Sequence, residues 1–148
     1  METTAIPQQL AEIVDDFQAL DEPDRLQLLL EFSRGLPELP ERFREHPELL
    51  EQVVECQSPL FLTLEFAPLP ERIVSLYFSA PQEAPTTRGF AGVLLEGLNG
   101  LPAAEILAVP DDVPERLGLT RAITPLRMRG MAAMLGRIKR QIRESPAA

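Results

Sequence analysis

The chain has 148 residues, of which 45% are hydrophobic and 25% charged, values that suit one globular domain with its own core. Asp and Glu number 23 against 14 Lys and Arg, and the net charge of −9 disfavours binding to a nucleic-acid backbone. No apolar run approaches the roughly 18 residues that span a bilayer, and residues 1–10 lack the pattern of a signal peptide. We expect a single cytoplasmic domain over 1–148, with its core at about 7–143, short flexible termini, and neither nucleic acid nor membrane as a partner.

Two helices are predicted at the start of the chain. The first carries one apolar stripe at helical spacing, formed by Leu10, Ile13, Val14 and Phe17. The second begins near Asp21 or Glu22 with Pro23 in its first turn, buries Leu26, Leu29 and Leu30, and ends at Gly35, expected in a left-handed conformation. Prolines interrupt residues 36–50, which predicts a short helix or two turns there.

The pattern then changes to a period of two. Apolar residues alternate with others at Leu60, Leu62, Leu64 and Phe66. Residues 73–78 form a second run, β-branched and aromatic, after a turn that contains prolines. The two runs predict an antiparallel hairpin. Val53–Glu55 could add a short third strand.

Helical spacing returns in the last third of the chain. One stripe consists of Phe90, Val93, Leu94 and Leu98. Thr86 or Thr87 is the expected N-cap of this helix, and Gly100 its end. Short helical pieces follow at 103–107 and 114–119.

The final helix is predicted to begin at Thr124, a capping residue followed by Pro125. Its buried side is expected to contain Met131, Met134, Leu135, Ile138 and Ile142. Helices, a hairpin and further helices together predict an α+β fold, with a small antiparallel sheet packed against helices.

Cys56 is the only cysteine, so it cannot form an intramolecular disulfide and cannot supply the ligands of a structural zinc site. Two interpretations remain: a buried packing residue, or a reactive thiol. Its position in the connection before the strand at Leu60 favours a functional role. Glu51 and Glu55 oppose activation, because negative charge disfavours the thiolate.

Arg88 and Arg127 are expected in the first turns of their helices, where the helix dipole favours anions over cations. Each could create a positive site for a thiolate, a persulfide or a carboxylate, or could be a surface arginine paired with an acid. His46, the only histidine, is expected to be exposed, and no sequence spacing pairs it with Cys56 as a base. No cluster of metal ligands is apparent, so we expect no metal site.

Four segments together resemble the SufE family of proteins that act with cysteine desulfurases. They are LDEPDRLQLLLEFSRGLPELPE, ECQSPLFL, APTTRGFAGVLLEGLNG and ITPLRMRGMAAMLGRIK, in this order along the chain. The resemblance covers about residues 7–143 and implies the small α+β fold shared by SufE and NifU (IscU-like) proteins.

The resemblance also implies site residues. Cys56 takes the place of the cysteine of the family's GCxS stretch, which forms the persulfide, and Ser58 matches the serine of that stretch. Gln57, between them, is expected to support the site. Supporting positions are implied at Arg88, Gly89, Arg127 and Gly130.

The sequence departs from the family pattern at two places. Leu60 and Phe61 replace the usual Val-Trp pair, and Glu55 replaces the glycine before the cysteine. An unpaired Glu55 would raise the pKa of the thiol, whereas a Glu55 paired with an arginine such as Arg88 or Arg127 would not.

By this resemblance we expect a sulfur carrier without turnover of its own. Cys56 would accept sulfur from a SufS-like, pyridoxal-phosphate-dependent desulfurase, stimulate that enzyme, and pass the sulfur to a SufBCD-like iron–sulfur scaffold. The pyridoxal phosphate belongs to the partner, so no cofactor is expected on this chain. The alternative is a non-catalytic regulatory domain that binds a desulfurase or a cluster scaffold.

Overall fold

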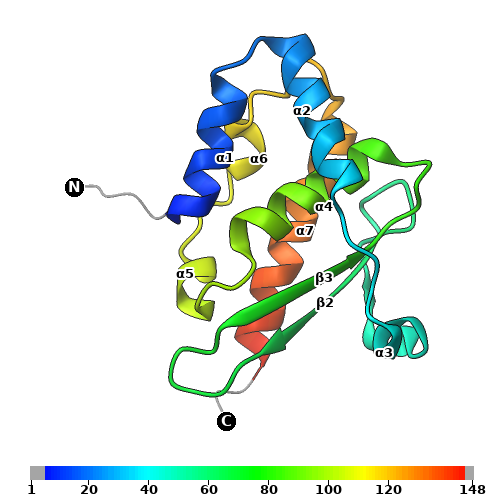
Figure 1. The fold of residues 1–148 in the computed structure, drawn as a ribbon, viewed down its shortest axis with the longest axis vertical. Helices are drawn as coiled ribbons and strands as arrows, with labels where there is room; N and C mark the ends of the chain where they lie inside the picture. The colour runs from blue at the N-terminus through cyan, green and yellow to red at the C-terminus, as the bar shows by residue number, and fades with distance from the viewer. Residues whose placement is uncertain (1–5, 146–148) are drawn as a thin grey trace.

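A computed structural model describes residues 6–145 of the chain (Figure 1). The expected flexible termini fall largely outside these residues and stay a prediction. The elements, in chain order, are α1 (Gln8–Gln18), α2 (Glu22–Arg34), α3 (Glu41–Arg44), a 3₁₀ turn η1 (Pro47–Leu49), β1 (Glu51–Gln52), β2 (Phe61–Phe66), β3 (Val74–Ser79), α4 (Pro85–Leu98), α5 (Ala103–Leu107), α6 (Val113–Arg116) and α7 (Pro125–Glu144). The predicted α+β class is confirmed.

The sheet has three antiparallel strands in the order β1-β2-β3. The predicted hairpin is β2 and β3, in a register that pairs Leu62 with Phe78. Along β3, every second side chain is buried, as the period of two indicates. The predicted third strand at Val53–Glu55 is wrong by two residues: β1 ends at Gln52, because the backbone turns directly after Val53.

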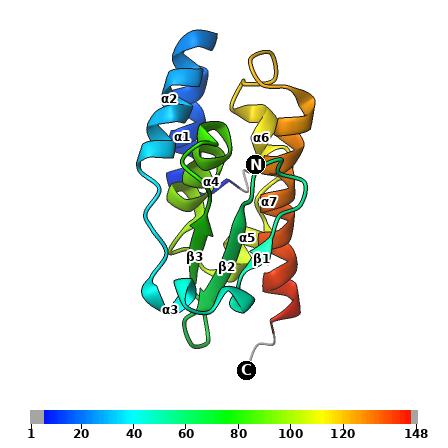
Figure 2. The ribbon, with the colours of Figure 1, turned by 90° about the vertical axis from the view of Figure 1, so that its right-hand side faces the viewer.

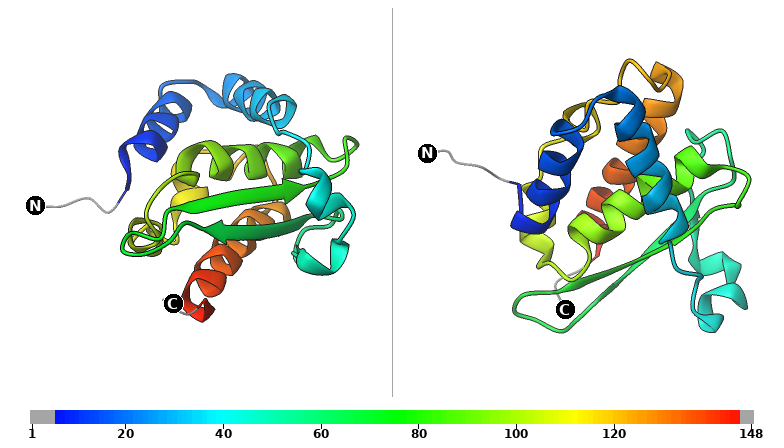
Figure 3. Two further views of the ribbon diagram at one scale, coloured as in Figure 1. Left: turned by 60° about the horizontal axis from the view of Figure 1, so that its bottom comes forward. Right: turned by 45° about the horizontal axis from the view of Figure 1, so that its top comes forward.

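The helices form two layers on one face of this sheet. Figure 2 shows α4 on the β3 side of the face and α7 on the β1 side. Helices α1 and α2 pack on α4, on its side away from the sheet (Figure 3, left). Within residues 6–145, no helix combines the length and the apolar character needed to cross a membrane.

Two predicted helix ends need correction. Gly35 is not left-handed: its φ of −87° is right-handed, and α2 ends there because Pro37 disfavours a helical conformation at the residue before it. The N-cap of α4 is Ala84, not Thr86 or Thr87, and it makes no side-chain capping bond. Pro85 supplies a pre-set φ at the first helical position, so α4 begins before the threonines.

Helix α7 begins as predicted. Thr124 is its N-cap, and the Thr124 hydroxyl oxygen accepts a hydrogen bond from the backbone N–H of Arg127 at 3.3 Å. The predicted core side of the helix is buried throughout: Met131, Met134, Leu135, Ile138 and Ile142. The predicted short helix of residues 36–50 is also present, as α3 and η1.

Two glycines of α4 allow its backbone to pack directly against the backbone of α2. A Cβ atom on Gly89 would lie 2.6 Å from the carbonyl oxygen of Leu29, and one on Gly92 would lie 2.5 Å from that of Phe32. Because both obstructing atoms belong to a helix backbone, they cannot rotate away. Gly89, which the family resemblance places near the site, therefore has a packing function in this interface.

We predict that Gly89→Ala lowers the free energy of unfolding by about 1–3 kcal/mol, because the added methyl group overpacks the α2–α4 contact. Gly136→Ala is the matched control, since a Cβ at this exposed position of α7 meets nothing within 4 Å. It should raise stability by about 0.4–1 kcal/mol. Urea unfolding of both variants measures the difference, and equal stabilities would contradict the packing role.

Candidate functional site

Cys56 lies in the loop between β1 and β2, which is closed at its base by a backbone hydrogen bond. The N–H of Val53 donates to the carbonyl oxygen of Leu60 at 2.9 Å, and the N–H of Cys56 donates to that of Val53 at 3.1 Å. Residues 53–60 thus form a compact loop, which lies beside the orange N-terminal half of α7 (Figure 2). Cys56 is half-buried in this loop. Its exposure alone therefore does not decide between a buried packing residue and a reactive thiol.

The sulfur of Cys56 rests on α7 at Gly130. A Cβ atom on Gly130 would lie 3.1 Å from Cys56 Sγ and 3.5 Å from its Cα. This is tighter than ordinary van der Waals contact, so any larger residue at 130 would displace the cysteine. The structure therefore brings together Cys56 and Gly130, two of the residues that the sequence selected.

Arg137 holds the same loop from farther along α7. Its Nη2 donates to Glu55 Oε1 and its Nη1 to Glu51 Oε2, each at 2.6 Å. Glu51 also accepts hydrogen bonds from Arg140 and Gln141. The glutamate that replaces the family glycine is therefore paired, with Arg137 and not with Arg88 or Arg127.

Sequence reasoning missed Arg137, and the one signal that bears on it does not single it out. Arg137 follows Gly130 by seven residues, two helical turns, so both lie on the same face of α7. Nothing in the sequence, however, selects this arginine among the several cations of α7 as the partner of a glutamate 82 positions away.

Burial and, to a smaller extent, the negative charge of Glu55 raise the pKa of the Cys56 thiol to about 11, with Arg137 partly opposing them. The expectation that a paired Glu55 leaves this pKa unchanged is therefore wrong, because Arg137 does not fully cancel the charge of Glu55. Hydrogen bonding to Arg137 lowers the pKa of Glu55, which therefore stays ionised at neutral pH. Desolvation is the largest of the effects on the thiol, so the resting sulfur is protonated at neutral pH.

Arg88 lies in the first turns of α4 and is occupied by backbone contacts. Its guanidinium donates to the carbonyl oxygens of Ala80 at 2.7 Å and Leu36 at 3.3 Å. These bonds join the ends of β3 and α2 to α4. Among the described residues, no hydrogen bond or ion pair joins Arg88 to the Cys56 loop.

Arg127 is exposed in the first turn of α7, one turn before the position that supports Cys56. Ser58 is half-buried and Gln57 exposed within the loop itself. The roles implied for these three residues stay predictions. His46 is exposed, as predicted, with its Nδ1 3.0 Å from Glu48 Oε2.

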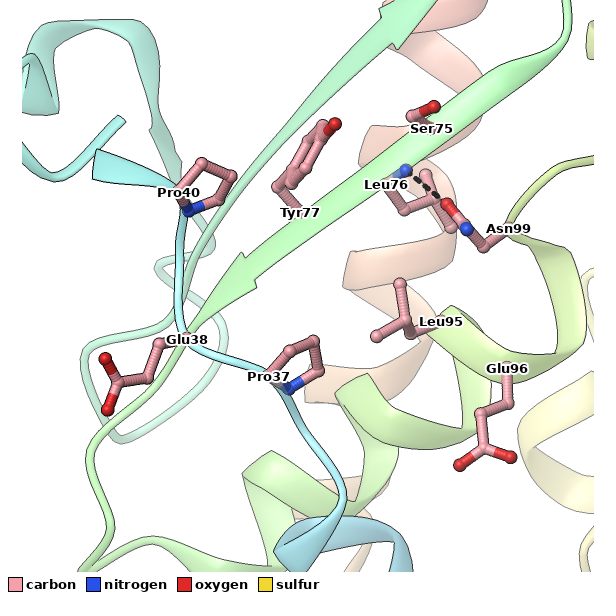
Figure 4. A pocket seen from close by; sticks show the side chains of 9 residues that line it. All are labelled: Pro37, Glu38, Pro40, Ser75, Leu76, Tyr77, Leu95, Glu96 and Asn99. Carbon is pink, nitrogen blue, oxygen red and sulfur yellow. Dashed lines mark hydrogen bonds between the residues drawn. The ribbon is translucent and has the colours of Figure 1, made fainter. Parts of the chain in front are cut away.

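A pocket of about 590 Å³ lies apart from the cysteine loop, between α4 and the edge of β3 (Figure 4). Its wall includes the hydrogen bond from Leu76 N–H to Asn99 Oδ1, 2.7 Å long. The carboxylates of Glu38 and Glu96 lie far apart in Figure 4, so they do not converge on one ligand. Nowhere in the described part of the chain do three His, Cys, Asp or Glu side chains gather as a metal site would require.

The raised pKa predicts how the thiol responds to pH. Alkylation of Cys56 by iodoacetamide should accelerate up to about pH 11 in the folded protein, whereas an unfolded thiol levels off above its pKa of about 8.5. Burial of the neutral thiol therefore stabilises the fold fully below about pH 8.5 and loses this effect as the pH rises through 11. A folded-state rate that levels off near pH 9 would contradict the effect of burial.

Comparison with known proteins identifies the family. The family model described as "SufE: Fe-S metabolism associated domain" matches residues 11–142. An uncharacterised SufE-like protein of Mycobacterium tuberculosis is 55% identical over 95% of this chain and 96% of its own length. A SufE-like protein of Rhizobium etli, also uncharacterised, is 31% identical over 94% of this chain and 93% of its own length.

A solved structure agrees with these sequence matches. The solution structure of a hypothetical protein from Thermus thermophilus superimposes with a TM-score of 0.79 and 37% sequence identity, and covers 94% of this chain and 96% of that one. The matched region contains both the Cys56 loop and helix α7 almost in full. The chain belongs to the SufE family.

Proposed function

We propose that this protein is a sulfur carrier for iron–sulfur cluster assembly, which accepts sulfur on Cys56 from a pyridoxal-phosphate-dependent cysteine desulfurase. Membership of a family associated with Fe-S metabolism supports the pathway. The observation that carries the residue assignment is the position of the sole cysteine, half-buried in a closed loop and seated on a glycine of α7.

The chemistry is a thiol–persulfide exchange. The sulfur of Cys56 attacks the terminal sulfur of the desulfurase persulfide, a new S–S bond forms, and the S–S bond on the desulfurase breaks. The proton of Cys56 passes to the departing desulfurase sulfur, so the products are a Cys56 persulfide anion and a desulfurase thiol. Sulfur and charge are conserved, and no oxidant or reductant is consumed.

The resting state of Cys56 suits a carrier that waits for its partner. A thiol with a pKa of about 11 is almost entirely protonated at neutral pH and reacts slowly with oxidants and stray electrophiles. Docking must relieve the burial of the sulfur before it becomes nucleophilic. On this proposal the chain has no turnover of its own, stimulates the desulfurase by removing its sulfur, and delivers that sulfur to a SufBCD-like scaffold.

The same raised pKa supports a second candidate, a regulatory domain that binds a desulfurase without accepting sulfur. On that alternative Cys56 would be a packing residue of the loop. The two candidates differ in what becomes of the sulfur.

We predict that incubation with a SufS-like desulfurase, cysteine and pyridoxal phosphate adds one sulfur atom to the protein, measured by intact-protein mass spectrometry. A thiol reductant should remove it. Cys56→Ser should gain no sulfur yet still bind the desulfurase in a pull-down or by calorimetry. A wild-type protein that binds the active desulfurase and gains no sulfur would support the regulatory alternative instead.

The surface around Cys56 predicts how the partner docks. Val54 in the loop and Leu126 on α7 are exposed apolar side chains, 68% and 41% accessible. Leu126 lies one turn before Gly130 on the same side of α7, so both apolar residues flank the cysteine.

We predict that Val54→Asp weakens desulfurase binding roughly tenfold or more, because the apolar surface that docking would bury is lost and an unpaired carboxylate enters the interface. Leu69→Asp is the control, since Leu69 is equally apolar, 48% exposed, and lies in the β2–β3 turn at the other end of the hairpin. Calorimetric titration measures both. Equal weakening by the two substitutions would place the interface elsewhere.

A further inference from the structure

We infer that Arg137 is a positioning residue for sulfur transfer: its bonds to Glu51 and Glu55 hold the Cys56 loop closed on α7, and release of Glu55 opens the loop. This inference rests on the proposed function and adds a control element to it. The three residues Glu51, Arg137 and Glu55 are called the latch below.

The latch joins the loop to α7 at two points. Gly130 supports the sulfur of Cys56, and Arg137, about 10 Å farther along the same helix face, binds the carboxylates on either side of the loop entrance. Glu51 precedes the turn at Val53, and Glu55 follows it. One guanidinium thus fixes the path of the chain directly before the reactive residue.

The two halves of the latch differ in strength. Glu51 accepts hydrogen bonds from Arg137, Arg140 and Gln141, and its side chain is only 25% exposed. Within residues 6–145, Arg137 is the one side chain that donates a hydrogen bond to Glu55, whose own side chain is 45% exposed. A pair this accessible shifts an equilibrium only about twofold to fivefold. Glu55 is therefore the half that opens, while Glu51 stays anchored.

Arg137 is also not fully satisfied by the closed loop. Its Nε is buried and has no hydrogen-bond partner among the described residues. A buried unpaired donor is unfavourable. A guanidinium with a spare donor, whose charge already acts on Cys56, is suited to bind the anion that replaces Glu55, such as a persulfide on the cysteine.

The charged groups that act on Cys56 come from both elements that face it. Glu55 of the loop disfavours the thiolate, and Arg137 of α7 favours it. Opening the Glu55 half would move the carboxylate away, relieve the burial of the sulfur, and leave Arg137 in place. Both changes make the sulfur more reactive.

The test is a double-mutant cycle read by hydrogen exchange of the loop amides. We expect Glu55→Gln and Arg137→Gln each to speed exchange at residues 53–60 about twofold to fivefold. The double variant should exchange no faster than the faster single one, because both substitutions break the same pair. Arg140→Gln is the comparison variant: it removes a cation that contacts Glu51 and not Glu55, and since Arg137 and Gln141 still hold Glu51, loop exchange should change less than in Arg137→Gln.

A second readout separates positioning from a purely structural role. In Glu55→Gln, the alkylation of Cys56 should become faster at pH 8 and its apparent pKa should fall below that of the wild type. In the presence of the desulfurase, the same variant should accept sulfur at a lower partner concentration.

Each result bears on one claim. Additive effects in the cycle, an unchanged pKa in Glu55→Gln, or an equal effect of Arg140→Gln would overturn the latch, even if the wild type accepts sulfur. Absence of sulfur on the wild type would overturn the proposed function, while the cycle would still report whether the latch closes the loop.

Discussion

The contact between the Cys56 loop and helix α7 is the interaction on which the site depends. A loop between two short strands has no fixed position by itself, and here α7 gives it one. Because Gly130 has no side chain, the sulfur of Cys56 can lie close to the backbone of α7. Arg137 binds Glu51 and Glu55, on the two sides of the turn. The helix is in turn fixed by its buried face and by its cap at Thr124.

Desolvation and charge act on the sulfur with different weights. Burial has the larger effect on the thiol, and the opposing charges of Glu55 and Arg137 modify it. Loop position therefore controls reactivity more strongly than any single charge does. On the proposed carrier function, the free protein stays unreactive and a small movement of the loop changes the reactivity of its sulfur.

The parts of the fold that local chemistry determines could be predicted from the sequence. Apolar periodicity located α1, α7 and the hairpin, and the Thr124-Pro125 pair located the start of α7. Predictions failed where a neighbouring proline decided the outcome, as at Gly35 and at the start of α4. The family resemblance selected Cys56, but the partner of Glu55 depends on a contact between segments 82 residues apart, which no local pattern encodes.

The glycine beneath the sulfur has a geometric consequence for the cargo. A second sulfur bonded to Cys56 Sγ would extend about 2 Å from it. The space toward α7 cannot hold that atom, since even a carbon substituent at Gly130 would lie only 3.1 Å from Sγ. The terminal sulfur must therefore project away from the helix, toward the open side of the loop. The backbone of α7 would in this way block one side of the carried sulfur atom. The atom would then face an acceptor that approaches from solvent.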